Sequence, residues 1–396
     1  MFLRQQGKND CGILYSIRKR CESNFVLDDK HKYRMLKKIC VITGVFFFLS
    51  GCSISPNNNS KPTGETAPAT GSLYKSFDAG KSFSAKVVVS EKLRISSADI
   101  LSWAIDLSNP QTMYVGSMDD GMFRTKDGAE HWEKMDFPPE KIYGIVIDSS
   151  NSRRIFATGV YGGVGKVYRT EDAGENWKEV YVEPGPGTVI ASLAMHPSDS
   201  RILYAATDKG GVIKSIDGGE QWKNIYQAEG PVTKILLGTK LPESIAALVF
   251  QKDVISSQDG GITWTDKAKI LEKIQGQERE GVELINPVSL NADPHTPSTL
   301  YAGTSSEGLL RSLDFGFTWN PIPIIESAKR YPIRAVAVSP DNSNEIVLAS
   351  GSAFYRSTDS GQHWSVTELG IDRGVSMILY EPGNSAILYF GLRKFK

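Results

Sequence analysis

The sequence predicts an all-β fold, a closed seven-bladed β-propeller of four-stranded antiparallel blades, and three features of the chain support this prediction. A motif of the form Ser/Thr-x-Asp-x-Gly-x-x-Trp, or a near variant, recurs with its aspartate at Asp78, Asp127, Asp172, Asp217, Asp259, Asp314 and Asp359. Successive aspartates are 49, 45, 45, 42, 55 and 45 residues apart, which matches one blade per repeat. The units at the two ends of this array are half-blades, and together they supply the seventh blade.

The overall composition fits a folded chain with a large core. Of its 396 residues, 40% are hydrophobic and 23% are charged. The 45 Lys and Arg residues balance the 45 Asp and Glu residues, so no global charge attracts nucleic acid or an acidic membrane surface. All four cysteines lie within the first 52 residues, which excludes a disulfide framework in the predicted propeller.

Residues 35–51 resemble a bacterial lipoprotein signal peptide. Two lysines, Lys37 and Lys38, precede an apolar run over 39–49, which ends in Leu49-Ser50-Gly51-Cys52. That run is shorter than the roughly 20 residues that cross a membrane as a helix. The resemblance implies lipidation of Cys52 and a bacterial cell-envelope location, at the outer membrane or the cell surface. Residues 1–34 have no place in such a signal, so we predict that translation starts at Met35.

The chain after Cys52 divides into a tether and the propeller. Residues 52–70 are rich in Asn, Ser, Pro, Thr and Gly, which predicts a flexible tether. Residues 71–396 form the predicted propeller. Apolar pairs before each motif are assigned to third strands: Leu73-Tyr74, Met122-Phe123, Val167-Tyr168, Val212-Ile213, Val254-Ile255, Leu309-Leu310 and Phe354-Tyr355.

Other short apolar runs supply the second and first strands. Second strands are predicted at 113–115, 155–157, 202–204, 245–247, 300–302, 346–348 and 387–389, and first strands precede them, as at 142–147, 189–195 and 333–338. The amino-terminal unit, 73–87, has only strands three and four, whereas the carboxyl-terminal unit, 375–391, has only strands one and two. Pairing them closes the ring and removes its exposed edges.

Each motif is expected to form a turn between strands three and four. The aspartate accepts hydrogen bonds from backbone amides, the glycine takes a positive φ, and the aromatic residue packs between sheets. Six copies end in tryptophan (Trp132, Trp177, Trp222, Trp264, Trp319 and Trp364), and the first copy uses Phe83. In Asp127-Gly128-Ala129 the glycine is shifted by one place, which leaves the turn geometry of that copy open.

These motifs are similar to those of the Asp-box (BNR) propeller proteins, which include sialidases, xyloglucanase-type glycosidases, the sortilin propeller domain and the photosystem II assembly-factor family. The resemblance covers residues 71–396. It implies that the Asp boxes lie away from the binding or active face, so that the seven aspartates are structural. A calcium site is the alternative, but one carboxylate per turn falls short of the roughly six to eight oxygens that calcium prefers. We expect neither a metal nor a cofactor.

Strand alternation sorts the remaining side chains onto two ends of the propeller. His131 and His363 fall in boxes, and His196 and His295 in turns between first and second strands, so all four lie at the box end. Arginines and lysines that precede the boxes are assigned to the scaffold. The side chains left for binding at the opposite rim are Tyr161, Arg279, Arg330, Arg334 and Arg373.

Two segments invite other interpretations. Gly159 to Lys166 resembles a phosphate-binding loop, but such loops join a strand to a helix, whereas this segment joins two strands of one blade. A wide hairpin that exposes Tyr161 is the expectation. The insertion at 266–281 has helical spacing of apolar residues and predicts a short helix at the rim.

Catalysis is the alternative function. The resemblance to sialidases would require an arginine cluster and an Arg-Ile-Pro signature, and the latter is absent from the chain. A xyloglucanase-type site would need two carboxylates across a cleft between two propellers, and only one propeller is encoded. Carboxylates in rim loops that could act as acid and base are Asp119, Asp120, Asp208 and Glu307.

We therefore expect a monomeric, lipid-anchored binding or assembly scaffold with a protein or glycan partner at the rim opposite the boxes. An Asp-box glycoside hydrolase, sialidase-like or xyloglucanase-like, is the alternative.

Overall fold

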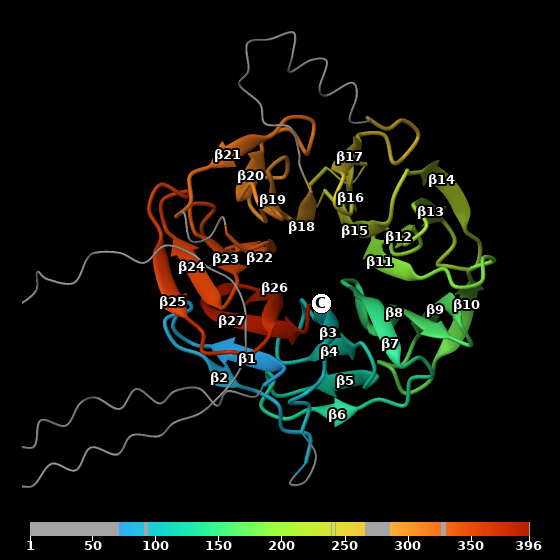
Figure 1. The fold of residues 1–396 in the computed structure, drawn as a ribbon. Coiled ribbons are helices and arrows are strands. Elements are labelled where there is room, and N and C mark those ends of the chain that lie inside the picture. Colours follow the sequence, from blue (N-terminus) through green and yellow to red (C-terminus); the bar gives the residue numbers. More distant parts are fainter. Residues whose placement is uncertain are drawn as a thin grey trace, which may run out of the picture. The chain divides into compact units, whose positions relative to one another are not determined.

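The computed structural model describes residues 71–90, 94–238, 240–241, 243–265, 286–325 and 330–395. These residues form seven antiparallel sheets around a common axis, with the first strand of each sheet innermost (Figure 1). The predicted signal peptide, Cys52, the predicted tether and the predicted helix at 266–281 lie outside the described residues. Within the described ranges, no helix is long and apolar enough to span a membrane.

Six blades are contiguous in sequence. Blade 1 contains β3 (Ile100–Ile105), β4 (Met113–Ser117), β5 (Met122–Thr125) and β6 (Glu133–Lys134). Blade 2 contains β7 (Lys141–Asp148), β8 (Asn151–Tyr161), β9 (Val164–Thr170) and β10 (Lys178–Val182). Blade 3 contains β11 (Ile190–Met195), β12 (Leu203–Thr207), β13 (Gly211–Ser215) and β14 (Lys223–Gln227).

The next three blades follow the same order. Blade 4 contains β15 (Val232–Leu237), β16 (Ile245–Val249) and β17 (Asp253–Ser257), and a bridge between Ser256 and Thr265 stands where other blades have a fourth strand. Blade 5 contains β18 (Pro287–Ala292), β19 (Leu300–Thr304), β20 (Leu309–Ser312) and β21 (Asn320–Ile322). Blade 6 contains β22 (Ile333–Val338), β23 (Ile346–Ser350), β24 (Ala353–Ser357) and β25 (Ser365–Glu368).

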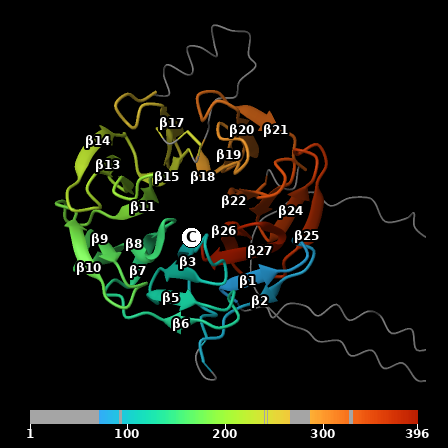
Figure 2. The same cartoon turned by 180° about the vertical axis from the view of Figure 1, so that it is seen from behind.

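Blade 7 is built from both ends of the propeller. Its sheet has the order β2-β1-β27-β26, formed by β2 (Ser84–Ala85), β1 (Leu73–Ser76), β27 (Asn384–Arg393) and β26 (Gly374–Glu381). Leu73 lies opposite Gly391 and Ser76 lies opposite Leu388 in the antiparallel pair. The predicted closure of the ring is therefore confirmed, and Figure 2 shows the closed ring from the other end.

The core lies between neighbouring blades. Second strands such as β16 are buried at every position, because both faces of an inner strand are covered by adjacent sheets. The box tryptophans contribute to these layers. Trp132 of blade 1 packs with Leu73 and Tyr389 of blade 7, and only 2% of its surface is exposed. Phe83 takes the same position in the first copy, in edge contact with the ring of Phe354 of blade 6.

The Asp box forms the predicted turn. In blade 6, Asp359 Oδ1 accepts hydrogen bonds from the amides of Gln362 (3.0 Å) and His363 (2.9 Å), and Ser357 Oγ accepts one from the Gly361 amide (2.8 Å). Two successive residues, Ser360 and Gly361, have positive φ angles of 60° and 89°.

The box of blade 1 has the same geometry despite its shifted glycine. Gly128 and Ala129 have φ angles of 70° and 75°, and the Ala129 amide donates to Thr125 Oγ1 at 3.1 Å. The turn needs two left-handed residues in succession, and here alanine takes the second position, where the other boxes have glycine. The turn geometry of this copy, which the sequence left open, is therefore the same as in the other boxes.

Low pH is expected to weaken the fold by protonating the boxes. Hydrogen bonds from Thr170 and Asn176 hold the pKa of Asp172 at about 2, and those from Thr263 hold the pKa of Asp259 at about 2. In the unfolded chain an aspartate has a pKa of about 3.9. Because folding lowers these pKa values, the stabilisation is present above about pH 4 and is lost as the pH falls towards about 2.

The urea midpoint of unfolding, followed by tryptophan fluorescence, is expected to fall across this pH window. Asp259→Asn should lower the midpoint at neutral pH and make its fall at acid pH smaller. A midpoint that does not change between pH 4 and pH 2 would contradict this role of the boxes.

The cations that precede the boxes join one blade to the next. Arg124 Nη1 donates to the carbonyl of Ala173 at 2.8 Å, and Lys214 Nζ donates to the carbonyl of Gly260 at 3.0 Å. The same contact runs from Arg169 to Gly218 and from Lys75 to Gly128, the latter from blade 7 to blade 1. These side chains belong to the scaffold, as the sequence predicted.

Candidate functional site

The two ends of the propeller differ in chemistry. We call the end with the Asp boxes and the turns between first and second strands the box face. The rim face is the opposite end, formed by the loops between second and third strands and by the connections between blades. His131 and His363 lie on the box face, with Nδ1 2.8 and 2.6 Å from the carboxylates of their own boxes. His196 and His295 lie there too, in turns after β11 and β18.

Tyr161 lies at the tip of a hairpin on the rim face. Strands β8 and β9 pair as far as Tyr161 and Val164, so only Gly162 and Gly163 form the turn, both with positive φ. The prediction of a wide hairpin is therefore wrong, because two glycines allow the tightest connection. The Tyr161 side chain is 53% exposed, with Lys166 Nζ 5.4 Å from the centre of its ring.

The four candidate catalytic carboxylates lie in rim loops of three different blades. Asp119 and Asp120 follow β4, Asp208 follows β12 and Glu307 follows β19. Their contacts are local. Asp119 lies 3.8 Å from Lys141 Nζ, Asp208 Oδ1 accepts a hydrogen bond from the Val189 amide at 2.8 Å, and Ser306 Oγ donates to Glu307 at 3.3 Å. These contacts serve the loops and do not pair one carboxylate with another.

Tyr143 is a half-buried tyrosine near these loops. It occupies the bulge near the start of β7, the strand of blade 2 nearest the axis. Burial raises the pKa of Tyr143; the positive charge of Arg393 opposes this rise, and the negative charges of Asp119 and Asp208 add to it.

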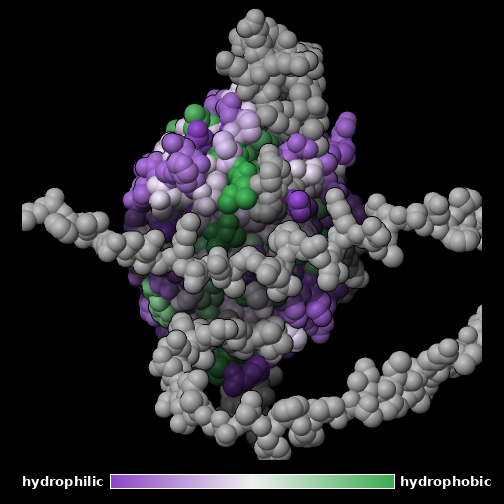
Figure 3. Space-filling model, turned by 60° about the vertical axis from the view of Figure 1, so that its left-hand side comes forward, coloured by the Kyte–Doolittle hydropathy of each residue, from purple (hydrophilic) through white to green (hydrophobic). Residues whose placement is uncertain are grey.

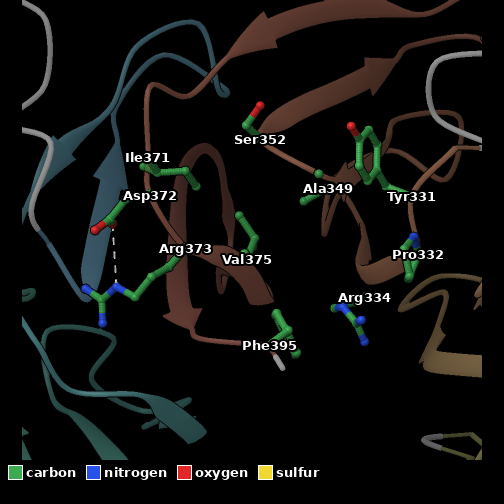
Figure 4. A pocket seen from close by; sticks show the side chains of 12 residues that line it. Tyr331, Pro332, Arg334, Ala349, Ser352, Ile371, Asp372, Arg373, Val375 and Phe395 are labelled. Atoms are coloured by element: carbon green, nitrogen blue, oxygen red, sulfur yellow. Dashed lines mark ion pairs between the residues drawn. The ribbon is translucent and has the colours of Figure 1, made fainter. Parts of the chain in front are cut away.

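A cavity opens on the rim face between blades 6 and 7. Its volume is about 300 Å³. Its lining comes from the start of β22, the loop between β23 and β24, the connection from β25 to β26 and the segment after β27: Tyr331, Pro332, Arg334, Ala349, Gly351, Ser352, Ile371, Asp372, Arg373, Gly374, Val375 and Phe395. Figure 4 shows Arg334 and Phe395 side by side at one end of this cavity, with Tyr331 and Ser352 at the other.

Two of the predicted rim arginines contribute to this cavity in different ways. Arg334 is half-buried at the bulge of β22, with its guanidinium carbon 4.0 Å from the centre of the Phe395 ring. Burial, together with the nearby charge of Arg393, lowers the pKa of Arg334. Arg330, four residues earlier, is exposed outside the cavity lining, and Arg279 lies outside the described residues.

Arg373 is a structural residue, which corrects its prediction as a binding contact. It is only 7% exposed, and its guanidinium turns away from the cavity (Figure 4). It donates to the carbonyls of Ala98 (2.9 Å), Ser96 (2.7 Å) and Gly71. These bonds tie the connection before β26 to the segments before β1 and β3. The Arg373 guanidinium therefore stabilises the closed ring and is not available to bind a ligand.

Three residues of this region were missed by sequence reasoning. Tyr331 and Phe395, respectively 57% and 37% exposed, form aromatic walls of the cavity, and Arg393 lies 5.7 Å from the Phe395 ring centre. Arg393 ends the second strand of blade 7, so the predicted closure was sufficient to place it at the rim. On the side of the molecule shown in Figure 3, hydrophilic residues alternate with a band of hydrophobic ones.

Comparisons with known proteins agree with this architecture. Residues 151–373 match the family model of the DUF6242 beta propeller domain. A Neosartorya fischeri protein named "Probable oligoxyloglucan-reducing end-specific xyloglucanase" is 24% identical over 212 residues, which are 50% of this chain and 25% of that protein. This chain therefore spans only a quarter of the length of that relative.

Solved structures show the same fold at low identity. The GH74 enzyme of Niastella koreensis aligns with a TM-score of 0.60 and 16% identity, covering 74% of this chain and 51% of that enzyme. YCF48 bound to D1 peptide aligns with a TM-score of 0.55 and 16% identity over 74% of this chain and 93% of that protein. YCF48 from Cyanidioschyzon merolae gives 0.53 and 13%, covering 74% and 95%. Because the family match covers more than half of the sequence, the chain belongs to the DUF6242 beta propeller domain family.

Proposed function

We propose that this protein is a non-catalytic binding or assembly scaffold, anchored in the bacterial envelope through lipid on Cys52, that holds a protein or glycan partner on its rim face. The observation that carries the proposal is the cavity between blades 6 and 7, where Arg334 and exposed aromatic side chains meet on the rim. On the box face, the aspartates and the cations before them are occupied by turns and by bonds between blades. Intact-mass analysis of the mature amino terminus tests the lipid on Cys52.

The relatives allow either a binding protein or an enzyme. One of the related structures is YCF48 bound to D1 peptide, whereas the Neosartorya fischeri protein is named as a probable oligoxyloglucan-reducing end-specific xyloglucanase. The local contacts of Asp119, Asp208 and Glu307 favour binding over hydrolysis, since a glycosidase needs two carboxylates facing one bond at about 5–10 Å.

Binding by the rim is expected to depend on its exposed side chains. The full chain, purified in detergent, would be measured against a glycan array and against detergent-solubilised envelope proteins by crosslinking. A rim variant, Tyr161→Ala with Tyr331→Ala, should lose the interaction by about tenfold or more, as expected for exposed aromatic contact residues. The matched box-face variant, Ile216→Ala, removes an exposed side chain and should bind as the parent protein does.

A panel of chromogenic glycosides separates the two functions. The scaffold predicts no turnover of any glycoside. Turnover that disappears in Asp208→Asn or Glu307→Gln would instead establish a glycoside hydrolase, and equal binding by the rim and box-face variants would reject the rim as the binding face.

A further inference from the structure

Two guanidinium groups share one aromatic ring in the cavity between blades 6 and 7. The guanidinium carbons of Arg334 and Arg393 lie 4.0 and 5.7 Å from the centre of the Phe395 ring. Among the described residues, neither arginine is in an ion pair. Two cations held close together without an anion repel each other, and this repulsion destabilises the folded state. Such an arrangement is stabilised when a ligand brings a negative charge.

The acidic side chain of the cavity does not fill this need. Asp372 lies with Oδ1 3.8 Å from Arg373 Nε, so its charge faces the structural arginine (Figure 4). Asp99 accepts a hydrogen bond from the Lys394 amide at 2.8 Å and lies 3.8 Å from Arg373 Nη1. Both carboxylates therefore belong to the closure of the ring.

Most of the remaining lining is apolar, apart from the hydroxyls of Ser352 and Tyr331. Pro332 and Ile371 supply aliphatic surface above the nearly buried Ala349 and Val375, and Phe395 and Tyr331 supply aromatic surface. A neutral sugar carries a hydroxyl on most of its carbons and would find few partners for them on these walls, which is costly. An apolar side chain gains from the same walls, and the volume of about 300 Å³ is at the small end of ligand pockets.

We infer that this cavity is a peptide-binding subsite, in which an apolar side chain enters between Ile371, Pro332 and Val375 and an adjacent carboxylate is bound by Arg334. A guanidinium binds a carboxylate with two parallel hydrogen bonds, and the stacked ring holds it in place. Arg393 adds a second positive charge at the same end. The inference rests on the proposed function, because it names the chemistry of the partner that the rim face holds.

The test uses the full chain and two sets of random hexapeptides, one with a free carboxyl terminus and one with a terminal carboxamide. Bound peptides should carry an aliphatic residue next to a carboxylate. Enrichment in the first set alone would identify the terminal carboxylate as the source, whereas enrichment of Asp or Glu beside an aliphatic residue in both sets would identify an acidic side chain. Either result supports the subsite.

Variants locate the binding. Arg334→Gln and Phe395→Ala should each weaken the best peptide by about tenfold or more, the usual effect of removing a charged hydrogen-bonding partner. Arg334→Lys keeps the positive charge but loses the planar guanidinium, so its affinity for the peptide should lie between those of the parent protein and Arg334→Gln. The matched control is Arg153→Gln, which removes an exposed arginine on the box face and should bind as the parent does. Because Arg334 is half-buried, thermal unfolding of each variant accompanies the binding measurement, and Phe395→Ala tests the same site from an exposed side chain.

Three outcomes would overturn the inference. These are the absence of enrichment in both sets, enrichment in the carboxamide set of peptides that have no Asp or Glu, and an equal loss of affinity in the Arg153 and Arg334 variants. If peptides are not enriched, a glycan or protein that still binds the rim with an affinity unchanged by Arg334→Gln would leave the proposed rim function standing without the subsite. Turnover of glycosides would reject the proposed function itself.

Discussion

Replacement of Arg373 by alanine is expected to lower the free energy of unfolding by about 3–5 kcal/mol, the usual cost of removing one partner from a buried charged network. The guanidinium is almost fully buried and donates to three backbone carbonyls, those of Gly71, Ser96 and Ala98. Without it, these carbonyls are left unpaired in a closed interior, and the segments before β1 and β3 lose their link to the connection before β26. Urea unfolding followed by tryptophan fluorescence measures the effect.

Two further variants define the origin of this loss. Arg373→Lys keeps the charge but cannot reach several carbonyls with one planar group, so an intermediate loss is expected. Arg330→Ala, at an exposed arginine of the same face, should change the free energy of unfolding by less than about 0.5 kcal/mol. A loss for Arg373→Ala no larger than that for Arg330→Ala would show that the ring does not depend on this residue.

Replacement of Trp319 by alanine is expected to cost about 3–5 kcal/mol of folding free energy, as for other large aromatic residues removed from a core. The side chain is 1% exposed and packs between blade 5 and Leu248 and Val254 of blade 4. Its indole nitrogen donates to the Gly316 carbonyl at 3.0 Å. The substitution therefore leaves a cavity and an unpaired carbonyl at one interface, which chemical unfolding would detect.

The repeat itself provides the control for Trp319. Trp222 holds the same position in blade 3 and makes the same bond, to Gly219 at 3.0 Å, but it is only partly buried. Trp222→Ala should therefore cost clearly less than Trp319→Ala. Equal costs at the two positions would mean that the hydrogen bond, and not burial between blades, determines the contribution of the box tryptophan.

The sequence was sufficient to predict the parts of the fold that depend on local chemistry. In each Asp box the aspartate bonds to amides only three or four residues away, so the local sequence is enough to predict the geometry of the turn. Even the exchanged Gly128 and Ala129 keep the turn, since what the backbone requires is two left-handed residues. Closure was also predictable, because half-blades at the two ends leave edges that only pairing removes.

The candidate site was less predictable because it is assembled from distant segments. Strand alternation assigned Arg373 to the rim correctly, but its burial depends on Gly71, Ser96 and Ala98, near the opposite end of the propeller chain. The cavity needs Tyr331 from one blade and Phe395 from the segment after the last strand. Contacts between segments so far apart in the sequence cannot be predicted from the spacing of residues. The exposure of Tyr161 was predicted, whereas the tightness of its hairpin was not.

Pairing of β1 with β27 sets an order of events for a ribosome that makes the chain from one end. The first strand, β1, can pair with β2 at once, but its other edge has no partner until β27, the last strand, is complete, so the ring stays open while blades 1 to 6 are being made. Contacts between such distant segments form slowly, and an unpaired edge is a template for aggregation until they do. A chain interrupted before β27 would keep that edge for good.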